Sequence, residues 1–325
     1  MHPMTRRASL ATLAAASTAL LAPAAFSQAP TKPLRVILPV AAGSGVDAAI
    51  RAMSNGVGKA LGQSLVIENL PGAGGITGTT QIVKAPKDGS AIGVVSNNHV
   101  VNPSVYKNVP FHAVDDVTPI MVVGAIPFVL VVHPSVPAKN LTELVALAKA
   151  KPGTLNYGSS GNGTILHLAG AMLVNETQAD IRHIPYRGMG QLTNDVLGGQ
   201  IQMAFISASV AATHVKAGTL RAFGVTTPKR TPVLPDVPTI AEQGYPNYAL
   251  DGWFGPIGPA GMPKAEVARI HKGFKDALAT PEVRDALLAQ GYTLWGSTPE
   301  EAQAYFRSEV VRMARLVQAA GVRID

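Results

Sequence analysis

The stretch from Leu34 to Ile50 reads LRVILPVAAGSGVDAAI, and the stretch from Leu155 to Gly170 reads LNYGSSGNGTILHLAG. Each runs from an apolar strand pattern through glycine and serine into a helix pattern rich in alanine or leucine. A turn of this kind aims the unpaired N–H groups and the positive end of a helix dipole at one point. The sequence therefore predicts two anion sites that need no charged side chain.

Strand and helix patterns alternate around these two turns. In the first part of the chain the expected strands cover 34–40, 65–69, 91–96, 121–126 and 129–133, and the expected helices cover 46–61 and 76–84. A second alternating unit covers 141–226, and three closing helices are expected at 264–279, 281–290 and 298–320. Such alternation predicts an α/β fold with mostly parallel sheets flanked by helices.

The closing helices need a sheet to cover, and the first alternating unit supplies one. We therefore expect a discontinuous first domain at 28–128 plus 253–325, and an inserted second domain at 129–252. Two crossing strands would form a hinge between them. The ligand cleft would lie between the domains, at the carboxyl ends of the strands.

Residues 1–27 have the pattern of a secretory signal peptide. Arg6 and Arg7 precede an apolar run that ends in small residues, with Gln28 as the expected mature start. The paired arginines also fit a twin-arginine signal. Cysteine is absent, which excludes disulfides and thiolate chemistry. We expect a periplasmic protein, and a monomer.

The remaining composition argues against several classes of function. The net charge is +7, but the basic residues are scattered without aromatic interleaving, which does not favour nucleic-acid binding. The eight histidines show no paired spacing typical of a zinc site. No Ser-His-Asp set or close carboxylate pair can be assembled, so we expect neither an enzyme nor a cofactor.

The turn in the first stretch, Ala41–Asp47, is called the first loop. It supplies Ala42, Gly43, Ser44 and Asp47 as ligand-binding candidates. Asp47 could either stabilise the helix dipole or hydrogen-bond to the loop or to a ligand. The loop also matches G-x-G-x-x-G/A, and Glu68 ends the next strand, as in dinucleotide-binding enzymes. A secreted dinucleotide-binding enzyme is thus an alternative, although the export signal counts against it.

Further candidates come from the turn in the second stretch, Ser159–Thr164, called the second loop, and from Tyr186–Gly188, called the third loop. Glycines permit close backbone approach to a ligand, and short hydroxyl and amide side chains add hydrogen-bonding groups. The candidates are Ser159, Ser160, Gly161, Asn162, Gly163 and Thr164, followed by Tyr186, Arg187 and Gly188. Arg187 could pair with a distal carboxylate or be a surface charge. His167 is expected to pack or to cap its helix.

Taken together, these motifs resemble the Bug family of extracytoplasmic receptors of tripartite tricarboxylate transporters. The resemblance rests on the two loops, on the run from Glu68 to Gly75, and on Pro185–Gly188, Leu197–Met203 and Trp253-Phe-Gly. It implies a two-lobed type II periplasmic binding protein, of the Venus flytrap kind. The implied ligand is a small carboxylate, delivered to membrane permease subunits. A receptor serving a sensor kinase is the alternative.

Two departures from the family pattern bear on the ligand. Asn97-Asn98-His99 replaces a more hydroxyl-rich stretch, and Ile206-Ser207 stands where many members have an acidic residue. Asn98 and Ser207 therefore join Arg187 as candidates for distinguishing one acid from another.

Overall fold

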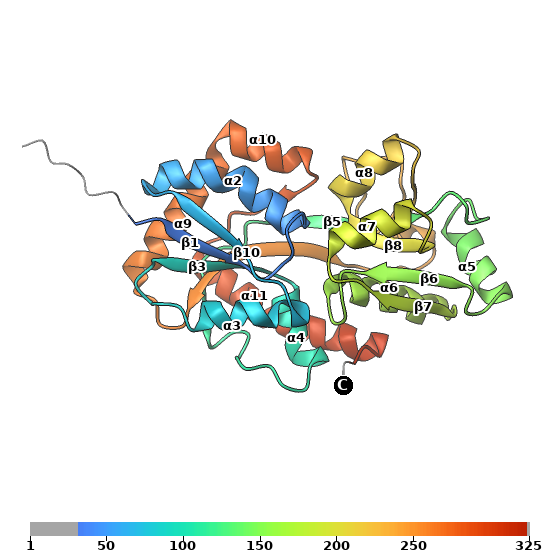
Figure 1. The fold of residues 1–325 in the computed structure, drawn as a ribbon, viewed down its shortest axis with the longest axis horizontal. Helices are drawn as coiled ribbons and strands as arrows, with labels where there is room; N and C mark the ends of the chain where they lie inside the picture. The colour runs from blue at the N-terminus through green and yellow to red at the C-terminus, as the bar shows by residue number, and fades with distance from the viewer. Residues whose placement is uncertain (1–31, 324–325) are drawn as a thin grey trace, which may run out of the picture. The chain divides into compact units, whose positions relative to one another are not determined.

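The computed structural model describes residues 32–323 (Figure 1). The signal peptide predicted at residues 1–27 lies outside this range. The strands are β1 (Leu34–Leu38), β2 (Leu65–Asn69), β3 (Ala91–Ser96), β4 (Val117–Pro119), β5 (Gly124–Val132), β6 (Leu155–Ser159), β7 (Ile181–Pro185), β8 (Met203–Ser207), β9 (Arg221–Val225), β10 (Asp251–Pro259) and β11 (Thr293–Leu294).

The helices lie between these strands and after them. The α-helices are α2 (Gly45–Leu61), α3 (Ile76–Val83), α4 (Asn98–Val105), α5 (Leu141–Ala150), α6 (Ile165–Thr177), α7 (Met189–Leu197), α8 (Ala208–Lys216), α9 (Lys264–Ala279), α10 (Pro281–Ala289) and α11 (Pro299–Ala320). Two short 3₁₀ turns are η1 (Ala73–Gly75) and η2 (Ala241–Gln243).

The first strand group is built around β1. This strand pairs in parallel with β2 on one side and with β3 on the other. The predicted β-α-β-α-β unit is therefore confirmed. β10 then pairs antiparallel with β3, so a strand from late in the chain completes this group.

The second strand group is built around β6 and β8. β6 pairs in parallel with both β7 and β8, whereas β8 and β9 pair antiparallel with β5. In Figure 1 this group, with α5 to α8, lies apart from the group that contains β1 to β3. β5 and β10 run between the two groups, but the division into two domains stays a prediction.

The structure corrects the prediction of two strands on either side of Pro127. β5 is one continuous strand across this proline. Residues 124–127 pair with β10, and residues 128–132 pair with β8 and β9. The proline lacks an N–H, and it stands where the strand changes partners, so the missing donor interrupts no continuous ladder.

Two helices were not expected from the sequence. α4 and α8 each begin almost directly after a strand, without a glycine loop, and α4 contains Pro103. Their short length and weak start signals explain the omission, since helix-start prediction depends on caps and periodicity.

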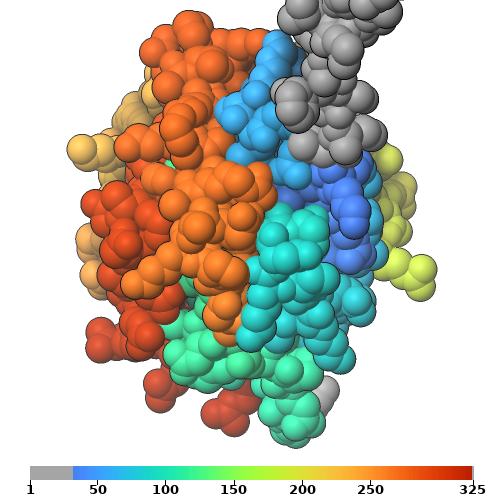
Figure 2. All heavy atoms as spheres, turned by 90° about the vertical axis from the view of Figure 1, so that its left-hand side faces the viewer, coloured from blue at the N-terminus to red at the C-terminus, as the bar shows by residue number. Residues whose placement is uncertain are grey.

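Two of the closing helices lie beside the first strand group, since α9 packs against α2 and α10 contacts both. α11 packs against α4 and also against α6, so it contacts both strand groups. Figure 2 shows this face, where the orange residues of α9 and α10 lie against the blue and cyan residues of the first part of the chain. Arg269 on α9 donates to the Gln63 side chain at 2.8 Å and so fastens the helix to the end of α2. α11 contributes Glu309, which accepts a hydrogen bond from the fully buried Trp253 indole at 2.9 Å.

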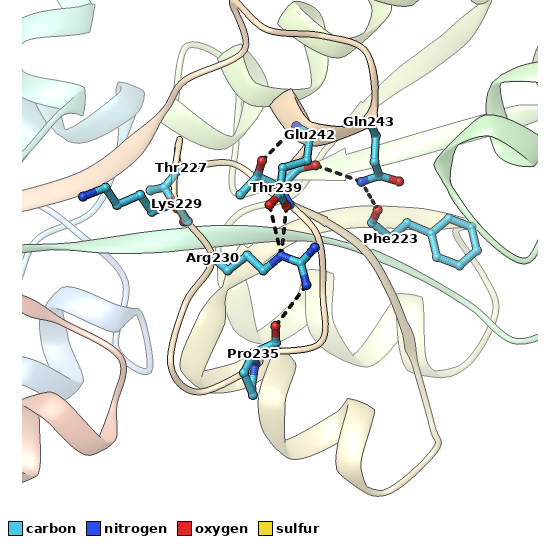
Figure 3. A network of polar contacts seen from close by, with 8 residues as sticks. All are labelled: Phe223, Thr227, Lys229, Arg230, Pro235, Thr239, Glu242 and Gln243. Atoms are coloured by element: carbon cyan, nitrogen blue, oxygen red, sulfur yellow. Dashed lines mark hydrogen bonds and ion pairs between the residues drawn. The ribbon is translucent and has the colours of Figure 1, made fainter.

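The passage from β9 to β10 is held by a polar network (Figure 3). Arg230 Nε donates to both carboxylate oxygens of Glu242, at 3.2 and 3.0 Å. Glu242 also accepts the Thr239 N–H at 2.6 Å, while the Glu242 N–H donates to the Thr239 hydroxyl at 3.0 Å. These reciprocal hydrogen bonds tie η2 to Thr239, the residue that precedes its N-cap, Ile240. Gln243 donates to the Phe223 carbonyl at 2.9 Å and so ties the passage to β9.

Candidate functional site

A cavity of about 480 Å³ opens where several strands end. Its walls come from the segments that follow β1, β2, β3, β6 and β7, together with Tyr106 after α4. The lining residues are Pro39, Val40, Ala41, Ser44, Pro71, Gly72, Ala73, Gly74, Gly75, Asn98, Tyr106, Ser160, Gly161, Asn162, Thr164, Tyr186, Arg187, Gly188 and Met189. Ligands of open α/β sheets bind at such carboxyl ends of strands.

A smaller cavity of about 90 Å³ adjoins the first. The two share Val40, Ser44, Asn98, Ser160 and Met189 as lining residues, so we call them the outer and the inner cavity. Apolar side chains such as Phe128, Ile165 and Trp253 form much of the inner wall. Polar groups are interspersed, and among them the buried Asn97 side chain and the buried Tyr292 hydroxyl have no hydrogen-bond partner in the described chain.

The first loop is shaped by Asp47. Its carboxylate accepts hydrogen bonds from the Gly43 N–H at 2.9 Å, from Arg51 Nε at 3.0 Å and from Asn69 Nδ2 at 3.0 Å. Burial opposes ionisation, but the hydrogen bonds from Arg51, Gly43 and Asn69 outweigh it and lower the pKa of Asp47. The side chain is thus engaged inside the loop and does not line either cavity.

The same loop presents the N-terminus of α2. Ser44 is the N-cap, and its hydroxyl accepts the Asp47 N–H. The N–H groups of Gly45 and Val46 have no partner within residues 32–323, and both residues line the inner cavity. This is the arrangement expected of an anion-binding helix start.

The second loop turns through two glycines with positive φ, Gly161 at 133° and Gly163 at 70°. Thr164 caps α6, because its hydroxyl accepts the His167 N–H and donates to the Gly161 carbonyl at 2.8 Å. The N–H groups of Ser160 and Asn162 have no hydrogen-bond partner in the part of the chain that the structure describes. Both residues line the outer cavity.

Two side chains that follow β3 reach this second loop. The Asn98 Oδ1 accepts the Ile165 N–H at 2.9 Å, and the Tyr106 hydroxyl donates to the Asn162 carbonyl at 2.9 Å. Asn98 therefore helps to hold the start of α6 as well as lining both cavities. Tyr106 was not predicted from the sequence, since nothing local signals a contact with a residue 56 positions away.

The charge balance of the site is one-sided. Within residues 32–323, Arg187 is the only charged residue that lines the outer cavity, and none lines the inner one. Neither a salt bridge nor a hydrogen bond engages the Arg187 guanidinium among the described residues. With the free helix N–H groups, this gives the site positive character with no carboxylate to balance it, as suits an anion.

The structure brings most of the predicted site residues together. Those that line the outer cavity are Ser44, Asn98, Ser160, Gly161, Asn162, Thr164, Tyr186, Arg187 and Gly188, and Ser207 lines the inner cavity. Those that line neither are Ala42, Gly43, Asp47, Ser159 and Gly163. Their contact with ligand stays a prediction. The run Pro71–Gly75 was overlooked as a wall, although it too leads from a strand into a helix.

The structure gives no support to the dinucleotide alternative. Glu68, which would have to meet a ribose, is paired with Arg35 through two hydrogen bonds of 2.9 and 2.8 Å. Among residues 32–323, no three metal-binding side chains of His, Cys, Asp or Glu gather in one place. No helix in the same range is both long and apolar enough to span a membrane.

Comparison with known proteins decides the family. Residues 49–322 match the tripartite tricarboxylate transporter family receptor, TctC. The chain belongs to this family. The predicted resemblance to Bug receptors is confirmed by BugT of Bordetella pertussis, which is 30% identical over 99% of both chains. A protein encoded in the tcbD-tcbE intergenic region of Pseudomonas sp. strain P51 is 35% identical over 89% of this chain and 86% of its own.

Solved structures confirm the fold class. The periplasmic binding protein BugD matches with a TM-score of 0.87 and 31% identity, over 91% of this TctC-family chain and 100% of its own. An R. palustris protein solved with adipate matches with a TM-score of 0.86 and 28% identity, over 91% of this chain and 99% of its own. MatC of Rhodopseudomonas palustris with bound malate matches with a TM-score of 0.84 and 26% identity, over 89% of this chain and 100% of its own. The chain is therefore a solute-binding receptor with the periplasmic binding protein fold, and its family and these neighbours are binding proteins rather than enzymes.

Proposed function

We propose that this receptor binds a small dicarboxylate that carries no ammonium group. The observation that carries the proposal is the lining of the two cavities, to which the described residues contribute one arginine and no aspartate or glutamate. A carboxylate is matched by this lining, whereas an ammonium would be buried without a counter-charge, which is costly. The relatives solved with adipate and malate carry ligands of this class.

The two carboxylates have different partners in this proposal. One is received where Ser44, Ser160 and the free N–H groups of the first two loops face the cavities. The other is received by Arg187, which lines the outer cavity but not the inner one. Backbone N–H groups bind any carboxylate, so we assign the choice of chain length and substituents to Arg187, Asn98 and Ser207.

The receptor would deliver its ligand to the membrane permease subunits of a tripartite tricarboxylate-type transporter. Membership of the receptor family supports this role. We further propose that residues 1–27 are removed on export and that the protein acts in the periplasm without a catalytic role or a cofactor.

A ligand screen tests the proposal. Purified protein is heated with succinate, malate, adipate, citrate, aspartate or acetate, and dissociation constants are measured by calorimetry for those that shift the melting temperature. A ligand at 100 times its dissociation constant stabilises the folded state by about 2.7 kcal/mol. We expect a clear shift with at least one dicarboxylate and none with aspartate. Tight binding of aspartate, or silence across all the dicarboxylates, would contradict the proposal.

A deletion of the permease genes separates transport from the sensing alternative. We expect uptake of the labelled dicarboxylate to require both the receptor and the permease. Uptake that is unchanged without the receptor, with loss of a transcriptional response to the acid, would instead indicate service to a sensor kinase.

A further inference from the structure

Two histidines contact the second loop without lining either cavity. The rings of His167 on α6 and His183 on β7 are stacked, with centroids 3.8 Å apart and planes inclined by 9°. Neither ring lines the outer or the inner cavity. Ligand contact therefore does not account for the pair, and each ring is instead engaged with the loop.

His167 holds one end of the loop. Its Nδ1 accepts the Gly163 N–H at 3.2 Å, while its own backbone N–H donates to the Thr164 hydroxyl. Because Nδ1 accepts a hydrogen bond, it carries no proton, and the neutral ring must bear its proton on Nε2.

His183 holds the other end through Ser159. The Ser159 hydroxyl donates to the Gly161 carbonyl at 3.0 Å and accepts the Gly161 N–H at 3.2 Å. A hydroxyl has a single hydrogen, and we assign it to the Gly161 carbonyl, so that His183 donates from Nε2 in the 2.7 Å contact. Ser159 is fully buried, and among the described residues the His183 ring is the only hydrogen-bond partner of its hydroxyl outside the loop.

We propose that the stacked His167–His183 pair is a positioning device that sets the second loop in its ligand-binding conformation. The pair engages the N–H of Gly163 directly and both polar groups of Gly161 through Ser159. The N–H groups of Ser160 and Asn162, which have no partner among residues 32–323, are left for the ligand. The effect on binding rests on the proposed function, because it assumes that this loop contacts the ligand.

The surroundings keep both rings neutral. Tyr157 lies 5.0 Å from the His183 ring, and Asp180 lines the same surface hollow as His183 without forming an ion pair with either imidazole. Burial lowers the pKa of His167 to about 4, and burial with repulsion from His167 lowers that of His183 to about 3. A proton on His167 Nδ1 would face the Gly163 N–H, so the neutral form is the one that fits the loop.

The first arm of the test uses ligand-free wild-type protein and needs no variant. Long-range ¹H–¹⁵N spectra report which imidazole nitrogen carries the proton. At pH 7 we expect both rings to be neutral with the proton on Nε2. A proton on Nδ1 of His167, or titration of either ring near pH 6.5, would overturn the proposal.

The second arm measures amide exchange at Gly163 and Gly161. His167→Leu removes the acceptor, and we expect exchange at Gly163 to rise at least tenfold. His167→Asn places an amide oxygen where Nδ1 stood and should restore the protection of the Gly163 amide. His183→Gln should likewise preserve the protection of the Gly161 amide. His214→Leu, on α8, is the matched control. Unchanged exchange at Gly163 in His167→Leu would refute the positioning role.

The third arm measures binding of malate and adipate by calorimetry. We expect His167→Leu to weaken binding at least tenfold and His167→Asn to recover most of it. If wild-type protein binds neither acid, the proposed function fails, while the spectra and the exchange data still decide the positioning role. If His167→Leu raises amide exchange at Gly163 but binds the acids as tightly as wild type, the conformation of the loop does not affect ligand binding. The proposed effect of the histidine pair on binding is then refuted.

Discussion

Asp47 and Arg187 show how two charged residues in neighbouring loops can have opposite roles. Asp47 is buried and accepts three hydrogen bonds from its own loop and from Asn69 and Arg51. Arg187 is exposed and has no partner among the described residues, yet it lines the outer cavity. The first therefore shapes the site, and the second is available to a ligand.

Replacement of Arg187 by glutamine tests this distinction. The ligand carboxylate loses a charged hydrogen-bond donor. Because the Arg187 side chain is exposed, we expect a loss at the lower end of the usual range for such bonds, roughly tenfold in affinity. Calorimetry with a dicarboxylate and with the matching monocarboxylate should show the loss for the former only. Arg284→Gln, which removes the same charge from α10, is the control. Equal losses for both acids would contradict the assignment of Arg187 to the second carboxylate.

At the scale of elements, the second loop depends on Gly161. Its φ of 133° lies in a region that side chains rarely adopt, and a Cβ there would meet the Tyr186 carbonyl at 3.3 Å. Gly161→Val should therefore abolish dicarboxylate binding, while the strain costs about 1–3 kcal/mol of stability. Gly198→Val is the control, since Gly198 has an ordinary φ of −80°. Calorimetry and urea unfolding measure the two effects, and unchanged affinity would mean that the loop is only a helix entry.

The long closing helix α11 offers a test that is independent of ligand. Thr298 and Glu301 form a capping box, in which the Thr298 hydroxyl accepts the Glu301 N–H at 3.2 Å and Glu301 accepts the Thr298 N–H at 2.8 Å. Thr298→Ala should lower the free energy of unfolding by about 1 kcal/mol. Thr298→Ser keeps the hydroxyl and should retain most of the wild-type free energy of unfolding. Urea titration measures both, and identical stability for alanine and wild type would show that packing alone holds the helix.

Sequence patterns predicted most elements because caps and loops are local signals. The bounds of α5 follow from the Asn140 cap, whose side chain accepts the Glu143 N–H at 2.9 Å. The continuity of β5 across Pro127 could not be predicted, since it depends on partners more than seventy residues later. The loops of the site were found for the same local reason. Which of their residues face the cavity, and the reach of Tyr106, are set by tertiary packing.

At the scale of the whole molecule, three histidines kept neutral by burial make stability depend on pH. Burial lowers the pKa of His99 to about 4, although its hydrogen bond to the Ala113 carbonyl acts the other way. The pKa of His167 is about 4 and that of His183 about 3. Below the ordinary value of about 6.5, the unfolded chain takes up protons that the folded chain does not. Stability should therefore fall as the pH drops from about 6.5 towards 4.

Thermal melts between pH 8 and pH 4 measure this effect. We expect a plateau above about pH 7 and a falling melting temperature below it. The double variant His167→Asn with His183→Gln removes two of the three groups and should flatten the slope. A melting temperature that is constant from pH 7 to pH 4, or a slope that the double variant leaves unchanged, would contradict the neutral histidines.

The place of β10 has a consequence for how the chain can fold during synthesis. β10 lies between β3 and β5, so the first sheet lacks an interior strand until Asp251–Pro259 has been made. Until then both neighbours present open edges, which are templates for aggregation. Contacts of such sequence separation also form slowly. The nascent receptor therefore cannot complete its first sheet until about four fifths of the chain has been made, and the order of synthesis delays the closure of that sheet.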